Sequence, residues 1–326
     1  MAKGPRMASA MSGVLCFVLG MGSGLAAAAG HPQLPPLLSS PSWIVVSESG
    51  GVVAGSGFIQ ARPIASITKL AMAMAYLDAR PRLDAMETIS ASDVDSLKGT
   101  SSRLPIGSSI SRRDLLRLAL ASSENRAASA IARGYPGGTP ALVAAMNAKA
   151  VAMGWSSARF VDPTGLSPRN VASAKDVALM ARAALRYPEA RDAAKSASYI
   201  QRIQLPSRPS QDLAYKNTNK PLRLGQVAAA VSKTGYTNEA GRCLAWALDA
   251  AAGGFSMALL GAASSEARDR DEVVLESWAR GVAPPPLPAV AKKKPHGKIR
   301  QSAGAQGKRQ GSAAAQGRSV TLKKEK

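Results

Sequence analysis

The sequence predicts an α+β protein in which an antiparallel sheet packs against a block of helices. Three observations lead to this prediction. Residues 42–59 have the pattern of a β-hairpin, residues 66–187 are mostly helical in pattern, and strand-like segments return between residues 199 and 262. In such an arrangement we expect the hairpin and the later strands to share one antiparallel sheet.

The N-terminus has the three parts of a secretory signal. Lys3 and Arg6 form a basic region, an apolar run follows, and small residues surround a cleavage site near Ala29. The apolar run is short for a bilayer span, which needs ~20 residues. We therefore expect residues 1–29 to be a signal peptide and the mature protein to be exported.

The C-terminal end changes composition after a proline-rich stretch at residues 283–288. Residues 292–326 carry eleven basic residues and one acidic residue, about half of the net charge of +21. With so few large apolar side chains, such a segment cannot offset the entropy lost on ordering. We expect residues 30–283 to form one folded domain and residues 284–326 a disordered basic tail. The composition of the tail is equally compatible with two roles, a solvated linker or a segment that makes electrostatic contact with the wall or membrane surface.

Helical patterns dominate the middle of the chain. The helix that follows Ser66 is apolar nearly all round, which is typical of a helix buried inside a domain. Ser111 begins a capping-box-like helix start, and residues 139–154 form a further helix with a clear start and stop. A helix over residues 173–187 is ended by Pro188.

The pattern then changes to strands. The predicted strands are residues 199–203, 227–233, 243–248 and 255–262, and a closing helix covers residues 265–280. The second of these strands places Lys233 at its end.

The chain has two histidines, His31 near the mature N-terminus and His296 in the tail. Neither is placed to serve a catalytic core, which excludes Ser-His-Asp and Cys-His chemistry and the zinc hydrolases that depend on histidine. There is no Walker-type loop or dinucleotide fingerprint, so we expect neither a cofactor nor a metal. The mature chain keeps one cysteine, Cys243, and therefore no internal disulfide. A hydrolase of this composition needs lysine or a carboxylate as its base.

Ser66 and Lys69 are three residues apart at a helix start, so their side chains share one face. A serine hydroxyl is a poor nucleophile until a base takes its proton, and a lysine of lowered pKa can be that base. A lysine in water has a pKa of ~10.4, so burial and the positive charge of Lys233 would have to lower it. Alone, Ser-x-x-Lys is a weak signal, and a capped helix start with a solvated lysine is the simpler explanation of it.

Two further motifs change that assessment. Ser123-x-Asn125 lies at a helix junction, where Ser and Asn are common caps, and Lys233-Thr234-Gly235 lies at a strand edge. In this order and spacing, with the Ser-x-x-Lys pair, they resemble the three motifs of penicillin-recognising serine enzymes.

The resemblance extends from about Trp43 to about Val282 and is to the low-molecular-mass penicillin-binding proteins, the D-alanyl-D-alanine peptidases. Within them the chain is most similar to the endopeptidase branch. The segments that carry the closer match are residues 62–69, 122–128, 135–138, 145–150, 159–167 and 233–238. The resemblance implies a β-lactamase/transpeptidase-like fold.

The chain departs from the carboxypeptidase relatives in two places. Those relatives usually have Gly and Asp where this chain has Glu124 and Arg126, and they end in an amphipathic anchoring helix rather than a basic tail. We expect Glu124 and Arg126 to reshape the acceptor side of the cleft. Arg126 could instead be structural, pairing with Glu124 or capping a helix.

The resemblance also implies the catalytic roles. Ser66 would attack a D-Ala carbonyl and form an acyl-enzyme, and Lys69 would take the hydroxyl proton. Ser123 would relay a proton to the leaving amine.

The implied binding roles fall on five residues. Asn125 would hydrogen-bond the substrate backbone, and Lys233 and Thr234 would hold a carboxylate. Gly235 would let the substrate lie close to the strand edge. The oxyanion hole would be formed by the backbone N–H groups of the nucleophile and of Tyr236.

The sequence therefore predicts a periplasmic serine peptidase that cuts D-alanyl bonds in peptidoglycan, most specifically the cross-link between D-Ala and the diaminopimelate of a neighbouring strand. β-Lactams would be covalent inhibitors.

The same residues would serve a carboxypeptidase that trims a terminal D-Ala. A β-lactamase is a poorer match, because no Glu-rich loop separates the second and third motifs, and Glu189 has a different context. A basic nucleic-acid-binding protein conflicts with the export signal and with an aromatic content of 4%, so no nucleic acid is expected as a partner.

Overall fold

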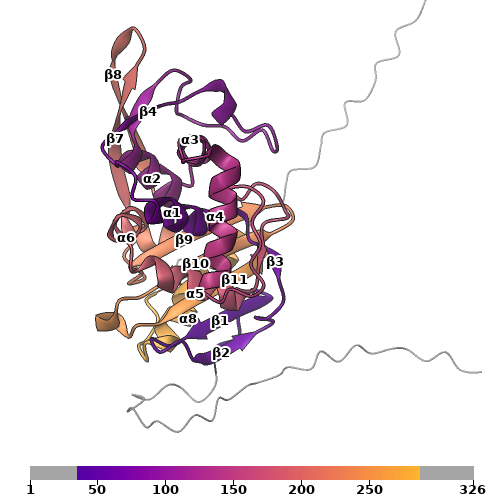
Figure 1. Ribbon diagram of the computed structural model, residues 1–326. Helices are drawn as coiled ribbons and strands as arrows, with labels where there is room; N and C mark the ends of the chain where they lie inside the picture. The colour runs from indigo at the N-terminus through magenta and orange to yellow at the C-terminus, as the bar shows by residue number, and fades with distance from the viewer. Residues whose placement is uncertain (1–34, 287–326) are drawn as a thin grey trace, which may run out of the picture. The chain divides into compact units, whose positions relative to one another are not determined.

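The computed structural model describes residues 35–286 (Figure 1). The predicted signal peptide lies outside these residues, as does the predicted tail beyond residue 286, so both stay predictions. No helix in the described part of the chain is long and apolar enough to cross a bilayer.

A five-stranded antiparallel sheet forms the centre of the fold, with the strand order β2-β1-β11-β10-β9. Its strands are β1 (Ser42–Val46), β2 (Val52–Ser56), β9 (Val231–Thr237), β10 (Gly241–Ala247) and β11 (Ser256–Ala262). Pairing of β1 with β11 joins the two ends of the folded chain, from Ser42 opposite Leu260 to Val46 opposite Ser256. The expectation that the hairpin and the later strands share one sheet is thus confirmed.

Helices cover both faces of this sheet, and the strands are apolar on both sides as a result. In β1, Ile44 and Val46 belong to the core shared with the helical block. Trp43 and Val45 face the opposite way, into a second core with the closing helix α8 (Ser265–Ala279). This division follows from the period of two along a strand.

The helical block begins with a short 3-10 turn at Ala65–Ile67 that runs into α1. Its helices are α1 (Thr68–Asp78), α2 (Arg112–Ala121), α3 (Asn125–Arg133), α4 (Gly138–Ala152), α5 (Ala174–Ala184) and α6 (Pro188–Lys195). Every residue of α1 from Thr68 to Tyr76 is buried, which confirms the prediction of an internal helix. In Figure 1, α1 lies in the middle of the helical block, with α2 above it, α4 beside it and β9 below it. The minor elements are β3 (Arg62–Pro63), β6 (Val171–Ala172) and α7 (Lys220–Arg223).

A second sheet lies at the far end of the helical block, in the order β4-β5-β7-β8. Its strands are β4 (Met86–Thr88), β5 (Ser109–Ser111), β7 (Ser198–Leu205) and β8 (Arg208–Lys216). The predicted strand 199–203 is therefore real but belongs to this sheet and not to the central one. Strand β8 was not predicted, because most of its side chains are exposed and polar and leave no apolar pattern.

Two other predicted boundaries are wrong. Pro188 does not simply end a helix: α5 ends at Ala184, and Pro188 is the first residue of α6, where its fixed φ and missing N–H suit a helix start. The predicted strand 227–233 is β9, which runs from Val231 to Thr237. Lys233 therefore lies inside a strand paired along its length with β10. The small residues before Val231 carry no periodicity that could mark the strand's start.

Candidate active site

Ser66 and Lys69 lie together at the start of α1, as the sequence predicts. Ser66 is in the 3-10 turn and Lys69 in the first helical turn. The amine of Lys69 donates a hydrogen bond of 2.9 Å to Ser66 Oγ. A neutral amine at this distance could accept the hydroxyl proton instead. The pair therefore has the geometry of a nucleophile and its base.

Two more oxygens surround the amine of Lys69. It donates to Asn125 Oδ1 at 2.7 Å and to the carbonyl oxygen of Thr164 at 2.6 Å. The side chain is fully buried, and this burial lowers the pKa of Lys69 to about 7, against the opposing charges of Asp162, Glu124 and Asp95. Near neutral pH, a substantial fraction of Lys69 is therefore uncharged and able to accept a proton.

Thr164 was not recognised from the sequence as part of the site. Its carbonyl is oriented by a turn that Asp162 stabilises. The Asp162 carboxylate accepts hydrogen bonds from the backbone N–H groups of Thr164 at 2.7 Å and Gly165 at 2.8 Å. Gly165 has φ of +84°, and a Cβ there would lie 2.0 Å from the carbonyl oxygen of Ala65. Only glycine allows this close approach. The Asp-Pro-Thr-Gly turn pattern was the available signal.

Asn125 is held by groups on both sides. Besides accepting from Lys69, its amide donates to Thr100 Oγ1 at 2.9 Å. Thr100 Oγ1 in turn donates to the Asp95 carboxylate at 2.6 Å. A chain of hydrogen bonds thus connects an outer loop to the buried lysine, and Thr100 and Asp95 carried no sequence motif that could have indicated it.

Ser123 lies on the short turn between α2 and α3, with a left-handed φ of +60°. This backbone conformation is uncommon for a residue other than glycine, and such strain concentrates at functional sites. In the described residues Ser123 takes no part in the hydrogen bonds that join Ser66, Lys69 and Asn125. Ser123 is therefore linked to the site by its position two residues before Asn125, and not by a hydrogen bond to Ser66 or Lys69 in the described residues.

The two residues beside Ser123 differ in role. The Glu124 carboxylate caps α3 by accepting from the backbone N–H of Arg126 at 3.3 Å. The guanidinium of Arg126 donates to the carbonyl of Leu104. This contact gives Arg126 a structural role, but in the described part of the chain neither expected form of that role is present: Arg126 forms no ion pair with Glu124, and Leu104 lies in a loop rather than at a helix end.

The third motif brings β9 against the turn that carries Ser66. A Cβ on Gly235 would lie 2.7 Å from the carbonyl oxygen of Ile64 and 3.2 Å from the backbone nitrogen of Ser66. Glycine is therefore required for this close packing of strand and turn. This close packing brings the backbone of β9 beside the Ser66 N–H. The next residue of the strand is Tyr236, whose side chain is half exposed.

The other two residues of the motif are buried. Lys233 Nζ donates to the carbonyl of Thr234 at 2.8 Å, and Thr234 Oγ1 donates to Thr218 Oγ1 at 2.5 Å. Burial first, then the charges of Lys69 and Arg268, hold the pKa of Lys233 well below its usual value. The expected influence of Lys233 on Lys69 is not among the main causes of the Lys69 shift.

Comparisons with known proteins agree with this geometry. The family model Peptidase S11, described as D-alanyl-D-alanine carboxypeptidase, matches residues 29–259. The chain is 37% identical over 264 residues to a D-alanyl-D-alanine endopeptidase of Pseudomonas aeruginosa, covering 81% of this chain and 84% of the relative. It is 40% identical over 218 residues to a D-alanyl-D-alanine endopeptidase of Escherichia coli, covering 67% and 69%.

Solved structures show the same fold. The crystal structure of the Streptomyces K15 DD-transpeptidase superimposes with a TM-score of 0.72 at 22% identity, over 76% of this chain and 100% of that one. The predicted transpeptidase-like α+β fold is confirmed by this likeness.

Proposed function

Since the chain belongs to the D-alanyl-D-alanine carboxypeptidase family of serine peptidases, we propose that it hydrolyses the D-alanyl cross-links of peptidoglycan through an acyl-enzyme on Ser66. One observation carries the proposal. The amine of Lys69 is buried, has a pKa of about 7 and lies 2.9 Å from Ser66 Oγ. A general base is most effective when its pKa is close to the working pH.

In the proposed reaction, neutral Lys69 takes the hydroxyl proton while Ser66 Oγ forms a bond to the carbonyl carbon of D-Ala. The backbone N–H groups of Ser66 and Tyr236 stabilise the oxyanion, a contribution that is usually the largest catalytic term. The C–N bond then breaks, and Ser123 passes a proton to the leaving amine. Water hydrolyses the resulting ester and restores Ser66.

Substrate binding is proposed for the residues around this centre. Lys233 and Thr234 would hold the carboxylate beside the scissile amide, and Gly235 would let the peptide lie along β9. Asn125 already bonds to Lys69 and Thr100, so its contact with the substrate backbone would be added to a side chain that is fixed in place. β-Lactams, which imitate the D-alanyl substrate, would acylate the same serine.

The choice of the cross-link as substrate rests on the relatives, three of which are named D-alanyl-D-alanine endopeptidases. The scissile bond is then the amide between D-Ala and the diaminopimelate of the neighbouring strand. A carboxypeptidase acting on the terminal D-Ala of a pentapeptide would use the same residues.

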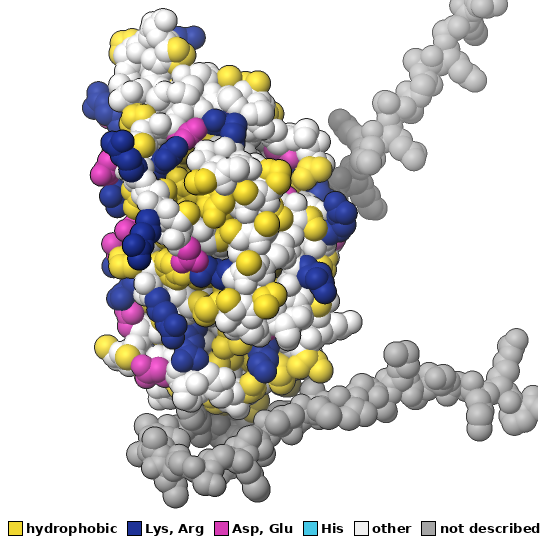
Figure 2. Space-filling view, in the orientation of Figure 1, with side chains coloured by type: hydrophobic (Ala, Val, Ile, Leu, Met, Phe, Trp, Pro, Cys, Tyr) yellow, Lys and Arg dark blue, Asp and Glu magenta, His cyan; other side chains and the backbone are white. Residues whose placement is uncertain are grey.

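The proposal also includes export of the protein and contact of its C-terminal residues with the cell wall. Residues 1–29 would direct the chain to the periplasm, where its substrate lies, and cleavage near Ala29 would be seen by N-terminal sequencing of the mature protein. The basic residues of 292–326 would contact anionic groups of the wall. On the face in Figure 2, many of the Lys and Arg side chains lie along the left edge, where Asp and Glu side chains interrupt them, so they do not form the continuous basic stripe that nucleic-acid binding favours.

The test offers two substrates at equal concentration, a D-Ala–diaminopimelate cross-linked dimer and a monomeric pentapeptide. We expect conversion of the dimer to monomers, with slow release or no release of D-alanine from the pentapeptide. The Ser66→Ala variant serves as the blank. Faster release of D-alanine from the pentapeptide would establish the carboxypeptidase activity instead.

A further inference from the structure

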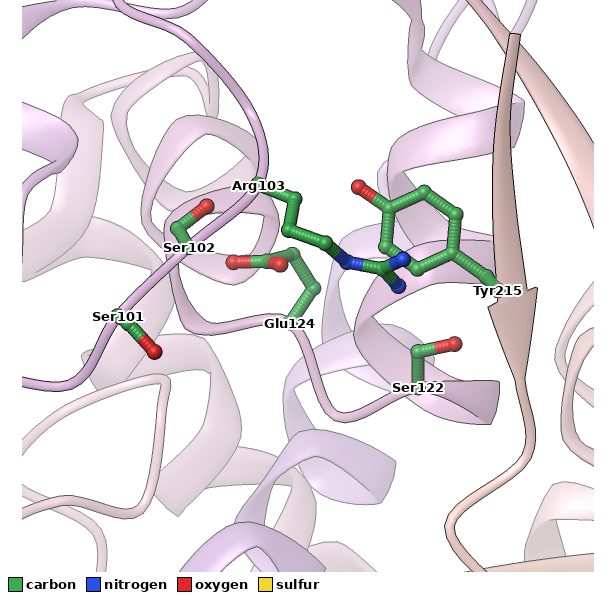
Figure 3. Close-up of a pocket in the computed structure, with 6 residues that line it drawn as sticks. All are labelled: Ser101, Ser102, Arg103, Ser122, Glu124 and Tyr215. Carbon is green, nitrogen blue, oxygen red and sulfur yellow. The ribbon is translucent and has the colours of Figure 1, made fainter.

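A cavity of about 270 Å³ opens beside the turn that carries Ser123 (Figure 3). It is lined by Ser101, Ser102, Arg103, Ser122, Glu124 and Tyr215. In the described residues none of these side chains bonds to Ser66 or Lys69, although the charge of Glu124 opposes the lowering of the Lys69 pKa. Because Ser122 and Glu124 flank Ser123, whose proposed partner is the leaving amine, the cavity lies on the leaving-group side of the scissile bond.

The cavity contains two opposite charges that do not neutralise each other. The Arg103 guanidinium lies 3.9 Å from the centre of the Tyr215 ring and donates one hydrogen bond of 2.7 Å to the carbonyl of Ala214. These contacts fix its plane and leave other N–H groups for a ligand. The Glu124 side chain is 9% exposed. Within residues 35–286, neither Arg103 nor Glu124 takes part in an ion pair.

Tyr215 supplies an independent observation. The residue is 1% exposed, and its hydroxyl has no hydrogen-bond partner in the described part of the protein. Buried polar groups without a partner are uncommon. Burial, with a smaller contribution from Glu124, raises the pKa of Tyr215 to about 12, so the hydroxyl keeps its proton. In Figure 3 it points toward the loop that carries Ser102 and Arg103.

Together these groups are complementary to a peptide that offers a carboxylate and an N–H donor close to each other. A guanidinium and a phenol can both donate to a carboxylate, and a carboxylate such as that of Glu124 can accept from an amide or ammonium. A lone D-Ala leaving group has only the carboxylate that Lys233 and Thr234 are proposed to hold. A diaminopimelate leaving group continues into a stem peptide that carries further amide N–H groups and free carboxylates.

We propose that this cavity binds the acceptor stem of the cross-link, with Arg103 and Tyr215 donating to a stem carboxylate and Glu124 accepting from an N–H of the same stem. The assignment rests on the proposed endopeptidase function, since only a cross-link places a stem peptide on the leaving-group side. It makes Arg103 and Glu124 residues that determine specificity rather than residues of the chemical step.

The test uses the full-length protein and two dimers that differ only in the acceptor stem. Every acceptor-stem carboxylate except the one beside the scissile amide is free in one dimer and converted to an amide in the other. The variants are Arg103→Ala, Glu124→Gln and Tyr215→Phe. Arg117→Ala is the matched control, because the Arg117 guanidinium stacks over the neighbouring Tyr199 ring at 4.2 Å but does not line the cavity. Acylation by a fluorescent penicillin, which has no acceptor stem, reports separately on the Ser66 centre.

For the dimer with free carboxylates we expect Arg103→Ala to lower kcat/KM at least tenfold. For the amidated dimer we expect a change below threefold, and Arg117→Ala should match the wild type on both. An equal loss on both dimers, or a parallel loss of penicillin acylation, would mean that Arg103 is merely structural and would overturn the proposal. The proposal would also be overturned if Arg103→Ala cleaved the free-carboxylate dimer at the wild-type rate.

A second measurement separates this proposal from the proposed function. The monomeric tetrapeptide, which carries the acceptor stem, should slow penicillin acylation of the wild type, and Arg103→Ala should weaken that inhibition about tenfold. If the wild type fails to cut dimers but shows this inhibition, the endopeptidase function is wrong, whereas binding of a stem peptide in the cavity still holds. If amidation of the donor stem, and not of the acceptor stem, removes the effect of Arg103→Ala, the cavity assignment is wrong.

Discussion

The amine of Lys69 lies 2.6 Å from the backbone carbonyl oxygen of Thr164, 95 residues further along the chain. The proposed base is therefore positioned by a loop as well as by its own helix. That loop is held by the Asp162 carboxylate and packs closely on the turn before Ser66 because residue 165 is glycine. The catalytic geometry consequently depends on a loop that begins far from Ser66 in the chain, and whose Thr164 carbonyl also accepts a hydrogen bond of 3.5 Å from Ser66 Oγ.

Gly165→Ala should disrupt the site. Its new Cβ would meet the carbonyl oxygen of Ala65 at 2.0 Å, so the loop must move and withdraw Thr164 from Lys69. Gly154→Ala is the matched control, since Gly154 has φ of +70° and open space around it. We expect the control to lose only the ~1–2 kcal/mol of a left-handed backbone and to keep its acylation rate. Gly165→Ala should lose more stability than the control, and it should also lose penicillin acylation. Thermal melts and penicillin labelling measure the two effects. Equal behaviour of the two variants would contradict the role of the loop.

Ser66→Ala should abolish covalent labelling by a fluorescent penicillin while leaving the fold intact. Ser66 is only partly buried, and the substitution removes a single hydroxyl. A water molecule can take the place of that hydroxyl as a hydrogen-bond partner of Lys69. Mass spectrometry of the intact protein after incubation with penicillin measures the adduct, and a thermal melt reports on the fold. A stable penicilloyl adduct on the alanine variant would mean that another residue is the nucleophile.

The acylation rate should rise with pH through about 7. Below that value Lys69 is protonated and cannot accept the hydroxyl proton, whereas above it the amine is neutral. Lys69→Arg should keep the positive charge but lose at least a hundredfold in rate, because a guanidinium stays protonated in proteins and general-base catalysis contributes about 10²–10⁴-fold. Stopped-flow acylation across pH 5–9 would test both statements. A flat profile or near-normal acylation of the arginine variant would rule out Lys69 as the base.

Glu272 should make the protein less stable as the pH rises from about 4.5 to about 8. Burial raises the pKa of Glu272 to about 8, and only one of its carboxylate oxygens is hydrogen-bonded, to Asn219 at 2.6 Å. In this interval the folded state keeps a proton that the unfolded state has lost, so the free energy of unfolding falls with pH. Glu272→Gln should match the wild type near pH 4.5 and exceed it above pH 8, by up to about 5 kcal/mol. Denaturant titrations at both pH values measure the difference, and an equal difference at both would refute this account.

The basic tail should be dispensable for chemistry. A chain truncated after Pro288 should cut soluble muropeptides at the rate of the full chain. Only the full chain should bind wall sacculi in a salt-sensitive way, because exposed charges are screened over about 8 Å at physiological ionic strength. Sedimentation with sacculi at low and high salt gives the answer. Salt-insensitive binding by both chains would leave the tail without a role in wall contact.

The sequence by itself determined the local features of this protein. The all-round apolar pattern after Ser66 predicted the buried helix α1, and the spacing of Ser66 and Lys69 placed their side chains on one face. The apolar hairpin and the later strands were enough to predict the shared central sheet. These features depend on neighbours within a few residues or on the burial of whole apolar faces, so a pattern of residue types is sufficient to reveal them.

Tertiary structure alone decided the rest. Polar strand β8 was invisible in the sequence, because its exposed side chains form no apolar pattern and its place is set by pairing with β7. Nothing near Lys69 in the chain indicates that its amine meets the Thr164 carbonyl, since a backbone oxygen has no residue type to recognise. The low pKa of Lys69 likewise comes from complete burial. A lysine becomes a base here because the folded protein removes water from it, and removal of water is a property of packing rather than of any motif.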